Sequence, residues 1–165
     1  MTTIAVVAGN PKPASRTLAA AQYVATELAG EPDLVVDLAL LGADLLDWQS
    51  EKVATLVEDV GRADFVIVAS PTYKGAYTGL LKLFLDRFPG GSGLSGLAVP
   101  LMLGGGLAHA LAPELVLRPV LTELGATVPG RGLFVVDTEF DNPGAYTEWL
   151  TATSPIIRDR LGPRG

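Results

Sequence analysis

The chain has 165 residues, 48% of them hydrophobic and 18% charged, and its formal net charge at pH 7 is −6. This composition excludes an intrinsically disordered chain, and the acidic balance argues against a nucleic-acid partner held by a basic patch. Because the sequence has no cysteine and a single histidine, it excludes disulfides and predicts no metal site.

Five short apolar runs rich in β-branched residues predict the strands of a sheet. They lie at residues 3–8, 34–38, 64–69, 98–103 and 132–136. The first run is apolar almost throughout, as expected for a strand of a parallel sheet that is covered on both faces.

The segments between these runs predict helices, at residues 15–29, 51–61, 76–88, 108–125 and 144–161. Five strand–helix units in a chain of this length are typical of the α/β flavodoxin-like three-layer sandwich. We therefore expect a five-stranded parallel sheet in the order 2-1-3-4-5 with helices on both faces. The six-stranded dinucleotide-binding order needs another strand, which the sequence does not offer. The prediction is one domain over residues 1–165.

The loop after the first strand has the character of a phosphate site. It reads Gly9-Asn10-Pro11-Lys12-Pro13-Ala14-Ser15-Arg16-Thr17 and leads into a helix. Ser15 and Thr17 supply hydroxyl donors, Arg16 supplies a charged fork, and the first helical turn adds free amides, which together suit a phosphate monoester. The plainer alternative is that Ser15 only caps the helix while Arg16 is solvated. The loop matches neither the pyrophosphate nor the nucleoside triphosphate motif.

The loop after the third strand is suited to a planar ring. Its residues are Pro71, Thr72, Tyr73, Lys74 and Gly75. An aromatic side chain, a flat proline surface and free amides are what a planar heterocycle needs, and Gly75 permits close backbone approach. Ligands of open α/β sheets bind outside the carboxyl ends of the strands, where this loop is expected. The plainer alternative is an ordinary turn.

The loop after the fourth strand begins with three glycines, Gly104, Gly105 and Gly106, and ends at His109. Ordering three glycines costs conformational entropy, which is a reason to expect close approach to a ligand. Their amides suit the pyrimidine edge of a flavin, where negative charge collects on reduction. A plain strand-to-helix turn is the alternative, and His109 alone is more typical of a cap than of a catalyst.

These three loops follow strands 1, 3 and 4, which meet at the switch point of the strand order in this fold. Each loop alone is a weak signal. Their convergence at one edge of the sheet predicts a bound flavin.

With these motifs the chain resembles the NAD(P)H-dependent FMN reductases, especially the alkanesulfonate-type reductases of two-component monooxygenase systems. The resemblance runs from about Thr3 to Asp141. It is carried by Gly9-Asn10-Pro11, Ser15-Arg16-Thr17, the segment from Ser70 to Gly79 with Leu81-Lys82, Gly104-Gly105 with Ala108-His109, and the segment from Leu117 to Leu121. It implies FMN held without a covalent bond, with its phosphate at residues 15–17 and its ring between residues 71–75 and 104–106.

The resemblance also implies a reaction. Reduced pyridine nucleotide, NADPH or NADH, would pass a hydride to flavin N5, and the cofactor itself carries this chemistry, so we predict no catalytic side chain. The electrons would go on to free flavin, a partner monooxygenase, a quinone, an azo dye or oxygen. Family members are usually homodimers or homotetramers, and the helix after Gly75 is expected at their interface.

Two other functions stay open at this point. A flavodoxin-type electron carrier would bind FMN without its own NAD(P)H site, but the first loop lacks the dense hydroxyl pattern of such carriers. A flavin-free hydrolase or regulatory module would need a partner for His109. The N-terminus shows no signal peptide, and the apolar runs are much shorter than the ~20 residues that span a bilayer. We therefore expect a cytoplasmic protein without a membrane partner.

Overall fold

Five parallel strands form a single sheet in the computed structural model, which describes residues 2–162. The strands are β1 (Ile4–Ala8), β2 (Leu34–Asp37), β3 (Phe65–Pro71), β4 (Leu97–Gly104) and β5 (Leu133–Val136). Their order is β2-β1-β3-β4-β5, and every neighbouring pair is parallel. All five predicted strands and the predicted order are confirmed.

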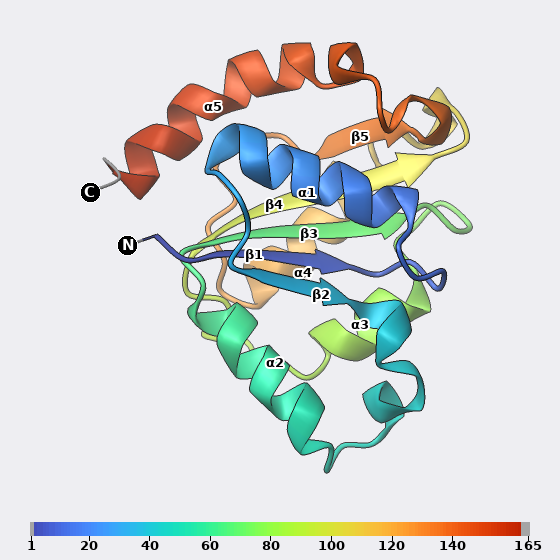
Figure 1. Ribbon diagram of the computed structural model, residues 1–165, viewed down its shortest axis with the longest axis vertical. Helices are drawn as coiled ribbons and strands as arrows, with labels where there is room; N and C mark the ends of the chain where they lie inside the picture. Colours follow the sequence, from blue (N-terminus) through green and yellow to red (C-terminus); the bar gives the residue numbers. More distant parts are fainter. Residues whose placement is uncertain (1, 163–165) are drawn as a thin grey trace.

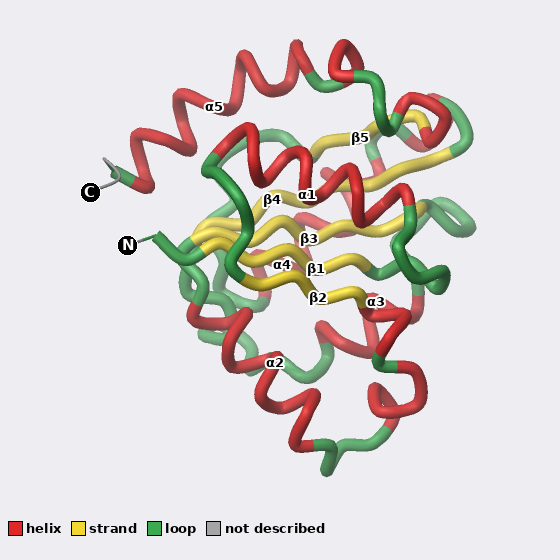
Figure 2. Tube along the Cα trace, viewed as in Figure 1, coloured by secondary structure: helices red, strands yellow, loops and turns green. Residues whose placement is uncertain are grey.

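Helices cover both faces of this sheet. The helices α1 (Arg16–Leu28) and α5 (Thr147–Leu161) lie on one face, and α2 (Glu51–Arg62), α3 (Gly79–Leu85) and α4 (Arg118–Glu123) lie on the other (Figure 1). Because successive strand residues point to opposite faces, β1, β3 and β4 each contribute buried residues to two separate hydrophobic cores, one on each face of the sheet. Figure 2 shows the resulting three layers, with the strands between two layers of helix.

The predicted helix over residues 76–88 begins later than expected. Tyr73 and Ala76 pair across a tight turn, and Thr78 is the N-cap, its side chain accepting from the Leu81 amide at 3.1 Å. A threonine hydroxyl in this position satisfies one of the free amides of the first turn, so the helix starts at Gly79.

The predicted helix over residues 108–125 is divided into three pieces. A 3-10 turn at Leu107–His109 is followed by a π-helical turn at Pro113–Leu117 and then by α4. Pro119 has no amide to donate and its ring would crowd the carbonyl four residues earlier. The wider π turn, in which the Arg118 amide donates to the Pro113 carbonyl, accommodates the chain before this proline.

Tyr146 joins α5 to the core of its face. Its side chain is fully buried, its ring packs edge-on against Tyr23 with centroids 4.8 Å apart, and its hydroxyl donates to the Phe140 carbonyl at 2.6 Å. Burial, with smaller contributions from Tyr23 and Asp141, raises the pKa of Tyr146 from 10.0 to about 12.

The raised pKa of Tyr146 predicts a loss of stability at alkaline pH. Above pH 10 the unfolded chain loses the phenol proton while the folded chain keeps it until about pH 12, so the free energy of unfolding falls as pH rises. The loss between these pH values is about 2–3 kcal/mol. A Tyr146→Phe variant should not show this pH-dependent fall in the free energy of unfolding. At neutral pH it should be about 1 kcal/mol less stable than the wild type, because it lacks the hydrogen bond of the Tyr146 hydroxyl.

The measurement is urea unfolding of both proteins from pH 8 to pH 11.5, followed as the difference in stability between them. A Tyr73→Phe variant is the control, because Tyr73 is 53% exposed. The prediction is wrong if the wild type and Tyr146→Phe lose stability in parallel across this range.

Candidate functional site

The carboxyl ends of β1 and β3 are joined by hydrogen bonds from one residue. The Thr78 hydroxyl donates to the Gly9 carbonyl at 2.6 Å, and the Thr78 amide donates to Ser70 Oγ at 3.0 Å. Thr78 is 3% exposed, so both bonds are shielded from water. Gly9, the first predicted site residue, is thereby held against the segment that follows β3.

The loop after β3 forms a tight two-residue turn. The Tyr73 amide donates to the Ala76 carbonyl at 2.8 Å and the Ala76 amide to the Tyr73 carbonyl at 3.2 Å. Lys74 and Gly75 between them have φ of 54° and 79°, the left-handed pair that a type I′ turn requires. The turn therefore explains Gly75 without a ligand, and it holds the Tyr73 ring exposed at the rim.

The loop after β4 lies directly against this turn. A Cβ added to Gly75 would be 3.7 Å from His109 Cε1, so the imidazole lies beside the turn backbone. The Thr72 amide donates to the Leu103 carbonyl at 2.7 Å. Thr72 Oγ1 is buried and has no hydrogen-bond partner among the described residues, and a Cβ added to Gly104 would be 3.4 Å from it. Loops from β3 and β4 thus share one surface.

The predicted phosphate loop is organised by its own side chains. Ser15 is buried and caps α1, accepting from the Leu18 amide at 3.2 Å. Thr17 is also buried, and its hydroxyl accepts from Asn10 Nδ2 at 3.1 Å. The amides of Arg16 and Thr17 open the helix, where helix geometry gives them no acceptor within the helix.

Arg16 is neither free nor simply solvated. Its Nη1 donates to Asp137 Oδ2 at 2.6 Å, and its guanidinium carbon lies 5.4 Å from the centre of the Phe140 ring. This pairing was not predicted from the sequence. The position of Asp137 directly after a predicted strand indicates that it lies at the same edge of the sheet, but it does not indicate Arg16 as its partner.

Asp37 is a second missed residue of the same kind. It ends β2, and its Oδ2 accepts from the Ala14 amide at 2.8 Å. Ala14 is held at φ 48°, a left-handed conformation that costs an alanine on the order of 1 kcal/mol. The carboxylate at the end of β2 therefore fixes the shape of the loop just before Ser15.

The residues at this edge of the sheet fit a flavin. Added Cβ atoms at Gly105 and Gly106 would have nothing within 4 Å, so these backbones face open space. The partnerless Thr72 hydroxyl offers a donor to a ligand atom. The open first turn of α1 offers amides and a positive dipole end to a phosphate.

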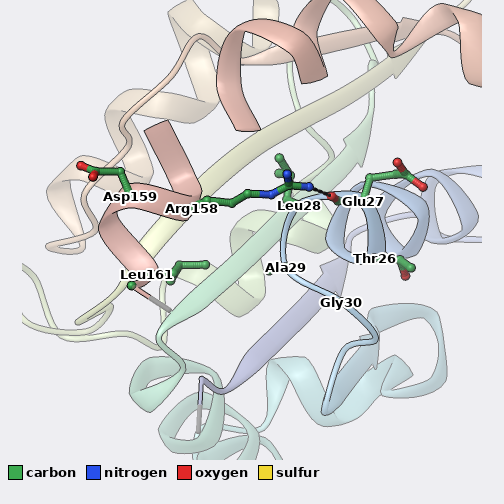
Figure 3. A pocket seen from close by; sticks show the side chains of 9 residues that line it. Thr26, Glu27, Leu28, Ala29, Gly30, Arg158, Asp159 and Leu161 are labelled. Carbon is green, nitrogen blue, oxygen red and sulfur yellow. Dashed lines mark hydrogen bonds between the residues drawn. The ribbon is translucent and has the colours of Figure 1, made fainter. Parts of the chain in front are cut away.

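A cavity of about 580 Å³ lies elsewhere, between the last turn of α1 and the end of α5 (Figure 3). Arg158 Nη2 donates to the Glu27 carbonyl there at 3.1 Å. These two helix ends lie at the amino ends of the strands (Figure 1), opposite the three loops, and the cavity contains none of the predicted site residues.

Comparison with known proteins points to one family. The family model described as "NADPH-dependent FMN reductase" matches residues 2–141. The chain is 35% identical over 141 residues to the FMN reductase (NADPH) of Escherichia coli (strain K12), covering 82% of this chain and 74% of that protein. It is 29% identical over 168 residues to the NADH-dependent FMN reductase SfnF of Pseudomonas fluorescens (strain Pf0-1), covering 97% and 89%.

Solved structures agree with this match. The apo structure of the NADH:FMN oxidoreductase EMOB superposes with a TM-score of 0.83 at 30% identity, covering 98% of this chain and 89% of that one. Among residues 2–162, no helix combines the length and the apolar character needed to cross a membrane. The reductase interpretation is favoured over an electron carrier and over a flavin-free module. The chain belongs to the NADPH-dependent FMN reductase family and is an NAD(P)H-dependent flavin reductase with FMN as its flavin.

Proposed function

We propose that FMN binds at the carboxyl edge of the sheet, with its phosphate at residues 15–17 and its ring between residues 71–75 and 104–106. The observation that carries this proposal is the contact of the loops themselves. Thr78 joins the loop after β1 to the end of β3, and the His109 ring lies beside Gly75. Three loops from distant parts of the sequence therefore form one continuous surface.

Each loop has a separate role in this proposal. The buried hydroxyls of Ser15 and Thr17 and the first amides of α1 bind the phosphate, with Asn10 holding Thr17 in place. The Thr72 hydroxyl and the amides of Gly105 and Gly106 bind polar atoms of the ring. Backbone dipoles at this position stabilise negative charge without having to reorganise during the reaction.

The exposed rim of the site is where we place the pyridine nucleotide. Tyr73, Lys74 and His109 are all exposed, so a nicotinamide can reach the ring from the solvent side. When bound, FMN supplies the hydride-accepting chemistry at flavin N5. The chain contributes orientation of the two rings, which lowers the barrier without an acid or a base.

For the later fate of the electrons, we propose that reduced flavin is supplied to a partner monooxygenase. The support is the resemblance to alkanesulfonate-type reductases in the three loops. A quinone or azo acceptor is the second candidate. We further propose that residues 1–165 act as one domain in the cytoplasm, where reduced pyridine nucleotide is available.

We also propose a homodimer or a homotetramer. The apolar side chains of α3, the helix after Gly75, are mostly used in the core, because Leu81, Phe84 and Leu85 are buried. The better candidate surface is a row of leucines spaced four residues apart, Leu107, Leu111 and Leu115, which are 73%, 54% and 65% exposed. Exposed apolar side chains in such a row are typical of a protein interface.

The test is an anaerobic titration of the purified protein and one equivalent of FMN with NADPH, and separately with NADH, followed at the flavin absorbance band. We expect bleaching much faster than in a protein-free control. Bound flavin that neither nucleotide bleaches would contradict the proposed function, and so would a protein that binds no FMN.

A further inference from the structure

The Arg16–Asp137 ion pair lies at the entrance of the proposed phosphate site. Arg16 is the first residue of α1, and Asp137 follows β5, 121 residues further along the chain. Their side chains are 54% and 41% exposed, and the distance between Arg16 Nη1 and Asp137 Oδ2 is 2.6 Å. The pair is therefore tight but remains accessible to a ligand from solvent.

This geometry occupies only part of the guanidinium. Arg16 has five N–H donors in a planar fork, and its hydrogen bond to Asp137 uses one nitrogen, Nη1. The Phe140 ring lies against the same group at 5.4 Å. A phosphate that binds Arg16 must therefore share the guanidinium with the Asp137 carboxylate or displace it.

We infer that Asp137 competes with the FMN phosphate for Arg16, so that the pair lowers the affinity for FMN and keeps the flavin exchangeable. This inference rests on the proposed function, because it assumes that the phosphate binds at residues 15–17. Asp137 would then be a residue that sets the affinity of the protein for a phosphorylated flavin. A flavin that must leave as a reduced product requires such limited affinity.

The Asp137 carboxylate could raise the affinity for FMN by orienting Arg16, or lower it by repelling the phosphate. We expect the repulsion to be the larger effect. A phosphate on the same guanidinium lies on the order of 6 Å from the carboxylate and carries about 1.5 to 2 negative charges, so the like charges repel through partly screened solvent. An ion pair this exposed contributes little to the orientation of Arg16. Removing the charge should therefore tighten FMN binding roughly three- to tenfold.

The test compares the dissociation constants of FMN and riboflavin, which lacks the phosphate, by equilibrium dialysis against oxidised flavin. The variant is Asp137→Asn, which keeps the shape of the side chain and a hydrogen-bond acceptor for Arg16. The matched control is Glu58→Gln, which removes the same charge from an exposed ion pair with Arg62 on α2. Circular dichroism checks that each variant is folded.

We expect Asp137→Asn to tighten FMN binding roughly three- to tenfold and to leave riboflavin binding within about twofold, while Glu58→Gln changes neither. The gain should shrink at high salt. In an Arg16→Gln background, Asp137→Asn should have a smaller effect on FMN, because no guanidinium remains to compete for.

Other outcomes overturn the inference. Unchanged or weaker FMN binding in Asp137→Asn would show that the carboxylate does not compete with the phosphate. An equal gain for riboflavin, or for Glu58→Gln, would show an effect unrelated to the phosphate. If the wild type binds riboflavin and FMN equally, the phosphate has no site here, and if it binds neither, the proposed function itself fails.

Discussion

A Gly9→Ala variant is expected to lose about 3 kcal/mol of stability and to bind FMN more weakly. A Cβ at this position would lie 2.5 Å from Leu81 Cβ and 3.1 Å from Leu81 Cα, so the backbone of α3 or of the loop has to move. Gly9 also accepts from the Thr78 hydroxyl and donates to the Ala69 carbonyl. Movement here carries the phosphate loop away from the loop after β3.

The matched control is Gly79→Ala, at the first position of α3, the helix that contains Leu81. A Cβ there would have nothing within 4 Å, and alanine favours helix, so this variant should be neutral or slightly more stable. Urea unfolding measures the stabilities, and equilibrium dialysis measures the FMN affinities. Equal stability of the two variants would contradict the packing argument, because Gly9 lacks room for a methyl group while Gly79 has it.

The fold could be predicted from the sequence because its signals are local. Each predicted strand is an apolar run next to polar or turn residues, as in the run over residues 64–69, although β3 itself continues through Ser70 to Pro71. The spacing of these runs leaves room for one helix in each connection, which favours parallel strands with helices on both faces. Local patterns of this kind require no knowledge of distant contacts.

The helix boundaries were less predictable because they depend on backbone conformation and on proline. Nothing in its residue type marks Lys74 for a left-handed φ of 54°, yet this conformation closes the turn and delays α3 to Gly79. Similarly, residues 108–125 have the composition of one helix. The restriction that Pro119 places on the preceding turn accounts for the π-helical turn at Pro113–Leu117.

The candidate site was predicted as a set of loops but not as a set of contacts. The positions after strands 1, 3 and 4 follow from the topology alone. The pairing of Arg16 with Asp137 crosses 121 residues and joins α1 to the segment after β5, which no spacing in the sequence indicates. The link from Thr78 to Gly9 crosses 69 residues and was missed for the same reason.

That link leads to the second large expected effect. A Thr78→Val variant keeps nearly the same shape but has no hydroxyl, so it loses the cap to the Leu81 amide and leaves the buried Gly9 carbonyl without its donor. A lost N-cap costs about 1 kcal/mol and an unsatisfied buried carbonyl costs about 1–3 kcal/mol. The expected total is about 3 kcal/mol, with weaker FMN binding because the loop after β1 is no longer fixed.

Thr78→Ser separates the hydroxyl from the methyl group. Serine retains both hydrogen bonds and should lose no more than about 1 kcal/mol, the value of one buried methyl group. Urea unfolding and FMN dialysis of both variants give the comparison. If Thr78→Ser weakens FMN binding as much as Thr78→Val does, then packing of the methyl group rather than the bond to Gly9 aligns the two loops. If only valine does so, the threonine hydroxyl is what couples the start of α3 to the geometry of the phosphate loop.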